Sequence, residues 1–244
     1  MKSVTTEQFE QMVNDDKPLV ILLPVGSVEP HGPHLGLLTD TIISEGCAEL
    51  AAKDLSKEHH VLIAPSVPYG VTDYAAGFKG AISIPEQSLV NYLQAVVDGF
   101  LLNGADHVCL INNHLEPDHY QAIVKASQLF EEGKCSVACP LKRRWARTLS
   151  DEFKRGECHA GQYETAIIMA ADPAGVNEEK MQVLPEVPIS LSDKINEGVN
   201  NFTDMGMNQA YAGAPSKATR EEGQELLEKL AIMVVTEVKE ALEK

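Results

Sequence analysis

The sequence predicts an α/β fold with three layers, in which helices cover both faces of a mostly parallel central sheet. Short runs of branched apolar residues alternate along the chain with longer segments that have helical periodicity, and this alternation is typical of parallel sheets. The apolar runs contain few polar residues, as expected for strands that are buried on both faces. We expect a single domain over residues 1–244, a length that one α/β core can fill.

The predicted strands are short, and the predicted helices are longer. Strands are expected at residues 18–25, 61–67, 107–111 and 136–138, with a short extended piece at 81–84. Helices are expected at residues 42–55, 88–103, 120–132, 164–171 and 219–244, and Gly104 is a candidate C-cap. Residues 172–214 contain scattered Pro, Gly and Asn without a clear period. Because sites in parallel sheets lie beyond the carboxyl ends of strands, the loops after Val25, Val67 and Ile111 are the candidate site loops.

Composition excludes several classes of protein. The chain has 20 basic and 36 acidic residues, a net charge of −16, which disfavours nucleic-acid binding because phosphate recognition needs clustered Lys and Arg. It has no apolar run of membrane-spanning length and no apolar signal-peptide core near its start, so we expect a cytoplasmic protein with no membrane partner. Its five cysteines have irregular spacing and predict reduced thiols, mostly buried, rather than a disulfide framework.

The loop after the first strand, GSVEPHGPHLGLLTD, is rich in metal-ligand residues. Glu29, His31, His34 and Asp40 lie within twelve residues. Carboxylate oxygen and imidazole nitrogen are ligands for zinc, manganese or iron. Glu29 and His31 are two apart, so they point the same way in an extended segment. A solvated loop with incidental charges is the alternative, and the position after a buried strand disfavours it.

A second cluster follows the third strand, in NNHLEPDH, where His114 and Glu116 are again two apart. Alone, this pattern would more often be a capping or hydrogen-bonded loop. Two such clusters on one sheet edge are more specific. Together they supply five ligands, Glu29, His31, Asp40, His114 and Glu116. Since one catalytic zinc uses three protein ligands, the sequence predicts two ions and a bridging carboxylate.

A third segment, ECHAGQYET, places His159 just before a predicted helix whose first turn holds Glu164. A histidine beside a metal-activated water can act as general acid or base. For His159 taken alone, a structural histidine is an equal alternative.

These segments resemble the signature segments of the creatininase (creatinine amidohydrolase) family. The loop containing Glu29 and His31 is the most specific of them, and NNHLEP, CHAGQYETA, KGAISI and GAPSKATREEG resemble the others. The resemblance covers nearly the whole chain and implies a creatininase-like three-layer fold, a two-metal site and a homohexamer.

The resemblance also implies roles for individual residues. Asp40 matches the bridging ligand, and Glu29, His31, His114 and Glu116 match the remaining ligands. His159 matches the catalytic histidine, with Glu116 as a second catalytic candidate. His34 and Glu164 match supporting residues around the ligands.

Two positions depart from the pattern of creatininases proper. Arg155 stands four residues before His159, where those enzymes carry a tryptophan that closes over the flat substrate, and Trp145 matches a second family tryptophan with altered spacing. Residues 72–80 lack the polar and histidine residues common there. We therefore expect the metal chemistry to be retained and creatinine to be a poor substrate, with Trp145 and Arg155 as substrate-contact candidates.

The predicted activity is metal-dependent hydrolysis of a cyclic amide C–N bond in a small polar molecule. Two zinc, manganese or iron ions per subunit would activate a water, and His159 would protonate the leaving nitrogen. Within enzymes, the alternatives are a hydrolase that opens a cyclic ketone such as an inosose, or a deformylase. A non-catalytic metal-binding assembly protein is the alternative from a different class.

Overall fold

The structure is a computed structural model that describes residue 1 and residues 3–244. Four parallel strands form one sheet in the order β2-β1-β3-β4. These are β1 (Leu19–Val25), β2 (His60–Ile63), β3 (His107–Asn112) and β4 (Cys135–Ala138). The long helices are α2 (Thr39–Leu55), α3 (Glu86–Leu102), α4 (Pro117–Ser127), α7 (Gln162–Ala171) and α10 (Arg220–Leu242). The shorter ones are α1 (Thr6–Val13), α5 (Arg143–Ala146), α6 (Asp151–Arg155), η1 (Pro173–Gly175), α8 (Glu178–Gln182), α9 (Leu191–Asn196) and η2 (Pro215–Lys217).

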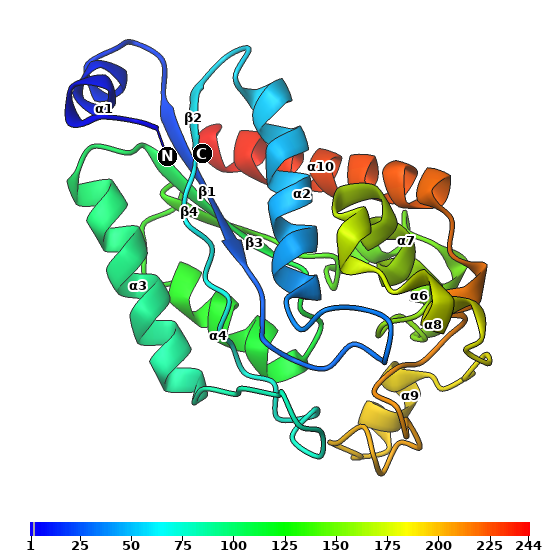
Figure 1. Cartoon of the computed structure of the whole chain (residues 1–244). Coiled ribbons are helices and arrows are strands. Elements are labelled where there is room, and N and C mark those ends of the chain that lie inside the picture. Colours follow the sequence, from blue (N-terminus) through cyan, green and yellow to red (C-terminus); the bar gives the residue numbers. More distant parts are fainter. Residues whose placement is uncertain (2) are drawn as a thin grey trace.

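Helices cover both faces of the sheet, so the three-layer prediction is confirmed (Figure 1). Alternate residues of β1 pack into different layers, as the two-residue period of a strand requires. Leu19, Ile21 and Leu23 belong to the core with α3 and α4, whereas Val20 and Leu22 belong to the core with α2, α7 and α10. All seven residues of β1 are buried, which explains the continuous apolar run in the sequence.

The order of the strands creates a topological switch between β1 and β3. The chain leaves β1, runs through α2 to β2 on one side, and then returns through α3 to β3 on the other side. In open parallel sheets such a switch opens a crevice at the carboxyl ends of the two strands. The loops after β1 and β3 therefore start side by side.

Most predicted elements are present, with shifted ends. The helix predicted at 120–132 starts earlier, at Pro117, and ends at Ser127, because Pro is favourable in a first helical turn and the apolar Leu129 that suggested a longer helix is 55% exposed. The strand predicted at 61–67 ends at Ile63, and only Val67 bridges β1 again, at Val25. Gly104, the predicted C-cap of α3, lies one residue beyond the actual C-cap Asn103 and has a positive φ of 96°.

Other parts of the chain contain secondary structure that the hydrophobic periodicity of the sequence does not predict. Helix α1 was not predicted, although Thr5 and Gln8 form a capping box at its start. The irregular region 172–214 contains η1, α8 and α9, and its apolar residues Phe202, Met205 and Met207 form a third small core. All five cysteines are free thiols and four of them are buried, in agreement with the prediction. Among the described helices, none has the length and apolar character to cross a bilayer.

Helix α10 lies close to α7 because Gly223 removes a side chain at their contact. A Cβ at Gly223 would overlap the backbone carbonyl of Ala166 in α7, and backbone cannot rotate away as a side chain can. The last glycine of the segment GAPSKATREEG therefore has a packing role.

We predict opposite effects of adding one methyl group to two helical glycines. Gly223→Ala should lower the free energy of unfolding by about 1–3 kcal/mol, the usual cost of overpacking. Gly99→Ala in α3, where a Cβ would meet nothing within 4 Å, should raise it by up to about 1 kcal/mol through helix propensity. Urea unfolding of both variants measures this, and equal effects would contradict the packing role.

Candidate metal centre

The register of the sheet brings the two predicted ligand loops together. Strands β1 and β3 are paired over their whole length, with Val25 opposite Asn112 at their carboxyl ends. The segment that carries Glu29 and His31 follows β1, and the segment that carries His114 follows β3. The segment before α7 adds His159 from the far part of the chain. The site thus lies at the topological switch, where the sequence predicts it.

Asp40 occupies the middle of this site, in the first turn of α2. Its carboxylate is 1% exposed, and its two oxygens face different imidazoles. Oδ1 is 3.1 Å from His31 Nε2, and Oδ2 is 3.0 Å from His114 Nδ1. Ser27 Oγ donates a hydrogen bond to Oδ2 at 2.8 Å and fixes the carboxylate. A carboxylate that offers one oxygen to each of two sites has the arrangement of a bridging ligand.

Backbone carbonyls fix the tautomers of three buried histidines. His31 Nδ1 donates to Glu29 O at 3.1 Å, and His114 Nε2 donates to Val71 O at 2.8 Å. His159 Nε2 donates to Pro30 O at 3.0 Å. Since a carbonyl only accepts, the ring nitrogen next to it carries the hydrogen, and the other nitrogen points into the site.

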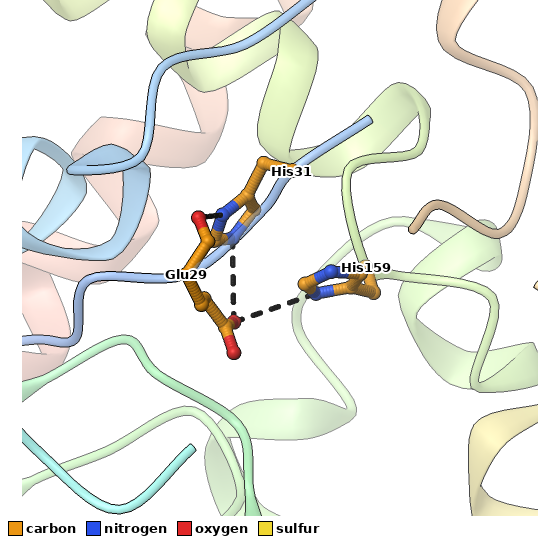
Figure 2. Close-up of side chains that lie close together, drawn as sticks. All are labelled: Glu29, His31 and His159. Atoms are coloured by element: carbon orange, nitrogen blue, oxygen red, sulfur yellow. Dashed lines mark hydrogen bonds and ion pairs between the residues drawn. The ribbon is translucent and has the colours of Figure 1, made fainter. Parts of the chain in front are cut away.

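The inward nitrogens converge on the Glu29 carboxylate. Its Oε1 is 3.2 Å from His114 Nδ1 and 3.7 Å from both His31 Nε2 and His159 Nδ1. Figure 2 shows His31 and His159 each directing a ring nitrogen to this carboxylate, one from the segment after β1 and the other from the segment before α7. Glu29 Oε2 in turn accepts a hydrogen bond from Thr72.

The donor set fits divalent cations. His114 Nδ1 is buried and has no hydrogen-bond partner, although two carboxylates lie within 3.2 Å of it. Four buried carboxylates share the site, Glu29, Asp40, Glu116 and Glu164. Buried charge of one sign is costly without a counterion, and among the described residues that line this cavity there is no Lys or Arg. Oxygen and imidazole donors in this number suit zinc, manganese or iron.

Protons take the place of a cation in the free site. Burial opposes a charge on His31, but Asp40 and two glutamates outweigh it and raise the pKa of the ring to about 10. Burial raises the pKa of Glu164 to about 8 and that of Glu116 to about 7. Because metal ligands must be deprotonated, binding of a cation should release protons from this cluster.

The ligand atoms form three groups within 4.8 Å, and these groups include all five residues predicted as ligands. The groups are Glu29, His31 and His159; Glu29, His114 and Glu116; and His31, Asp40 and Glu164. Glu164 was predicted as a supporting residue, but its Oε2 is 3.5 Å from His31 Nε2. The structure therefore makes Glu164 a candidate ligand as well. Its first-turn position in α7 was visible in the sequence, but its distance to His31 was not.

Other predicted residues lie around the centre. Burial, together with the charge of His31, lowers the pKa of His34 to about 4. Its Nε2 is 2.8 Å from Thr165 Oγ1 in α7, so His34 connects the first loop to that helix. Glu116 accepts hydrogen bonds from the backbone N–H groups of Asp73 and Tyr74 at 3.0 and 3.1 Å.

Sequence reasoning missed the support provided by His119 and Thr72. His119 Nδ1 accepts from Val71 N–H at 3.2 Å, and its Nε2 donates to Asn112 Oδ1 at 3.1 Å. It thereby holds the carbonyl that orients His114. His119 is part of the polar segment after β3 and so gave a weak signal, whereas no spacing in the sequence connects Thr72 to Glu29.

The two predicted substrate-contact residues lie outside the cavity. Trp145 Nε1 donates to Glu237 Oε1 of α10 at 2.6 Å. Arg155 is half exposed and forms an ion pair with Glu157 at 2.9 Å. Each side chain is engaged by a carboxylate elsewhere, so the structure brings neither to the metal centre.

Comparison with known proteins decides the family. A family profile described as creatinine amidohydrolase matches residues 2–238. The chain belongs to the creatininase family. A mycofactocin precursor peptide peptidase of Mycobacterium tuberculosis (strain ATCC 25618 / H37Rv) is 29% identical over 84% of this chain and 79% of the relative. A 3-dehydro-scyllo-inosose hydrolase of Thermotoga maritima is 29% identical over 62% of this chain and 46% of the relative.

Solved creatininases share the fold. The crystal structure of creatinine amidohydrolase (creatininase) covers 100% of this chain and 98% of its own, with a TM-score of 0.78 and 18% identity. A manganese form of creatininase has a TM-score of 0.77 at 18% identity, with the same coverage. The named relatives in this family are hydrolases. In this chain, the buried ligand groups are the observation that fits a divalent metal.

We predict that Asp40→Ala loses all tightly held metal. Asp40 offers one oxygen to His31 and the other to His114, the imidazoles of the two proposed sites, so its removal should empty both. Metal per subunit, measured by inductively coupled plasma mass spectrometry after gel filtration, should fall from two to near zero. Asp118→Ala, at an exposed acid nearby in α4, should keep the full content. Two ions retained in Asp40→Ala would exclude the bridging role.

Proposed function

We propose that this protein is a hydrolase that uses two divalent metal ions per subunit to break an amide C–N bond in a small molecule. A cyclic amide is the first substrate class to test. The observation that carries the proposal is the Asp40 carboxylate, whose two oxygens face two imidazoles of fixed tautomer at 3.1 and 3.0 Å. Zinc, manganese and iron are the candidate ions.

The ligands divide into two sets that share Asp40. Glu29, His114 and Glu116 would complete one set, and His31 and Glu164 would complete the other. A pair of divalent ions in such a site supplies a water of lowered pKa and polarises a carbonyl oxygen. Ser27 and the backbone carbonyls that orient the histidines hold the ligands in place before a metal arrives.

His159 is the proton carrier in this proposal. Its Nε2 hydrogen is engaged by Pro30 O, so Nδ1 is the atom that faces the cavity. Burial and the charge of His31 lower the pKa of His159 to about 4, so the ring is neutral and Nδ1 carries a lone pair toward the cavity. Nδ1 takes the proton from the attacking water and then donates it to the leaving nitrogen. Glu116, which also lines the cavity, is the second candidate for this transfer.

The relatives support amide hydrolysis over ring opening of a ketone. A peptidase and an amidohydrolase both break amide bonds, and the peptidase match covers 84% of the chain. The inosose hydrolase match covers 62% of the chain and keeps a cyclic ketone as the second candidate. Deformylase activity, and metal binding by a non-catalytic assembly protein, are the two other functions that the substrate panel below can indicate. We also propose that residues 1–244 form a single domain, that the protein assembles as a homohexamer and that it is cytoplasmic.

We predict that His159→Asn retains the fold and the metal but loses turnover. The expected loss is about 10²–10⁴-fold, the usual contribution of a positioned proton carrier. His60→Asn, which removes a histidine paired with Asp15 at the surface, is the matched control and should keep full activity. Steady-state kinetics, metal analysis and thermal melting of both variants measure this. Near-normal turnover of a correctly folded His159→Asn protein would remove His159 from the mechanism.

We predict that activity on amides depends on added metal. Protein stripped with a chelator and reloaded with zinc, manganese or iron should hydrolyse members of a panel of cyclic amides, dipeptides and formamides, and Asp40→Ala should hydrolyse none. Creatinine should be a poor member, because none of the described residues that line the cavity is a tryptophan. Turnover of an inosose alone would select the ketone hydrolase, and no turnover with any member would contradict the enzymatic proposal.

A further inference from the structure

The cavity above the metal centre has a polar floor and an apolar wall and ceiling. The polar part of the lining, called the floor here, is formed by four carboxylates and two imidazoles, namely Glu29, Asp40, Glu116, Glu164, His114 and His159. The remaining surface is formed mainly by apolar or aromatic side chains, namely Tyr74, Leu115, Pro117, Leu191, Ile195 and Phe202. A substrate that places its reacting carbonyl at the floor must therefore direct its remaining atoms toward this apolar surface.

Acidic groups on a substrate find no basic Lys or Arg side chain there, within the part of the chain that the structure describes. Among the described residues that line the cavity, the charged side chains are carboxylates and histidines, without a Lys or Arg. Three basic residues near these segments are paired with carboxylates, Arg155 with Glu157, Arg144 with Glu237 and Lys194 of α9 with Glu197. A carboxylate directed at the apolar part of the lining would lose its water without gaining a counterion, and hydroxyls directed there would stay unpaired.

The ceiling is formed by Leu191, Ile195 and Phe202, which lie in one segment of the chain, residues 191–202. Through Phe202 this segment packs on His159, the proposed proton carrier. The Phe202 ring lies 4.4 Å from the His159 ring and 6.3 Å from the Tyr74 ring. Phe202 N–H also donates to Tyr74 O at 2.9 Å. Leu191 and Ile195 lie one turn apart in α9, so both can face the cavity from the same side of that helix.

The cavity is narrow in this conformation. Its empty volume is about 370 Å³, but the centre of a water molecule can reach only about 30 Å³ of it. A substrate larger than a few water molecules therefore has to displace the ceiling. Because Leu191 and Ile195 are only half-buried on a short helix, α9 can yield, and its apolar face then packs on whatever group the substrate presents.

We propose that this site selects substrates with an uncharged aliphatic or aromatic group next to the scissile carbonyl, and rejects those with an acidic or polyhydroxylated group there. The proposal rests on the proposed metal-dependent hydrolysis for its chemistry, but its evidence is the lining of the cavity. Each methylene that the ceiling covers should improve recognition roughly fourfold, as expected for burial of apolar surface.

Binding of simple hydroxamates tests the proposal without requiring turnover. A hydroxamate binds a metal through two oxygens and directs one variable group into the cavity. Isovaleryl and phenylacetyl hydroxamates present apolar groups, the monohydroxamate of succinic acid presents a carboxylate, and gluconohydroxamate presents hydroxyls. With the metal-loaded protein, calorimetry should give dissociation constants at least about tenfold lower for the two apolar members.

A charge placed in the ceiling should reverse this preference. Leu191→Arg should weaken the apolar hydroxamates and strengthen the succinic one, changing the ratio of their dissociation constants at least about tenfold. Val183→Arg is the matched control, because Val183 is 78% exposed and does not line the cavity. Ile195→Asn is a second variant for the case in which Leu191→Arg unfolds, and it should reduce the apolar preference alone.

The outcomes separate this proposal from the proposed function. Equal binding of all four hydroxamates, tighter binding of the acidic or hydroxylated member, or no binding of any member overturns the apolar selection. An apolar preference that disappears in Leu191→Arg and persists in Val183→Arg supports it. If that preference is found while no amide in the panel is hydrolysed, the proposed amidase activity fails and the apolar selection stands.

Discussion

The buried carboxylate of Asp40, held between two imidazoles, is the interaction on which the rest of the site depends. Each of its oxygens faces one ring nitrogen at hydrogen-bond distance. Around it lie three more buried carboxylates, and a cluster of this charge needs a positive partner. Protons on His31 and His114 supply that partner in the free protein, and divalent cations are the partner that the donor set fits. The surrounding structure holds the cluster in position.

Backbone groups do most of this holding. Three carbonyls, from Glu29, Pro30 and Val71, each accept one imidazole hydrogen and leave the other nitrogen free to bind. A carbonyl cannot change its hydrogen-bonding role, so the tautomers are fixed by the path of the chain rather than by other side chains. That path depends on the parallel register of β1 with β3, and on His119, which anchors the loop that contains Val71.

The floor and the ceiling of the cavity come from different parts of the fold. The floor follows strands of the central sheet, and the solved creatininase shares this overall fold. The ceiling comes from α9 and Phe202, in a region with its own small apolar core. Relatives named as a peptidase and an inosose hydrolase show that substrates differ within the family. Binding residues on loops over a rigid scaffold can change without disturbing the metal ligands.

The sequence alone predicts much of the metal centre because its ligands follow strands with a strong local signal. The continuous apolar runs predict β1 and β3, and Glu29, His31, Asp40 and His114 lie within fifteen residues of their carboxyl ends. The edge common to parallel strands is enough to expect these residues together, as the structure confirms for their positions. Their roles as ligands remain predictions.

Only the tertiary structure decides which side chains meet across long sequence distances. It brings Glu164 to His31 and Thr72 to Glu29, and it engages Arg155 with Glu157 instead of placing it over the site. It also folds Phe202 onto His159, a contact that no period in residues 172–214 indicates. Local periodicity reports the burial of one face of one element, whereas these contacts depend on how separate loops pack against each other, and that packing is set by the whole fold.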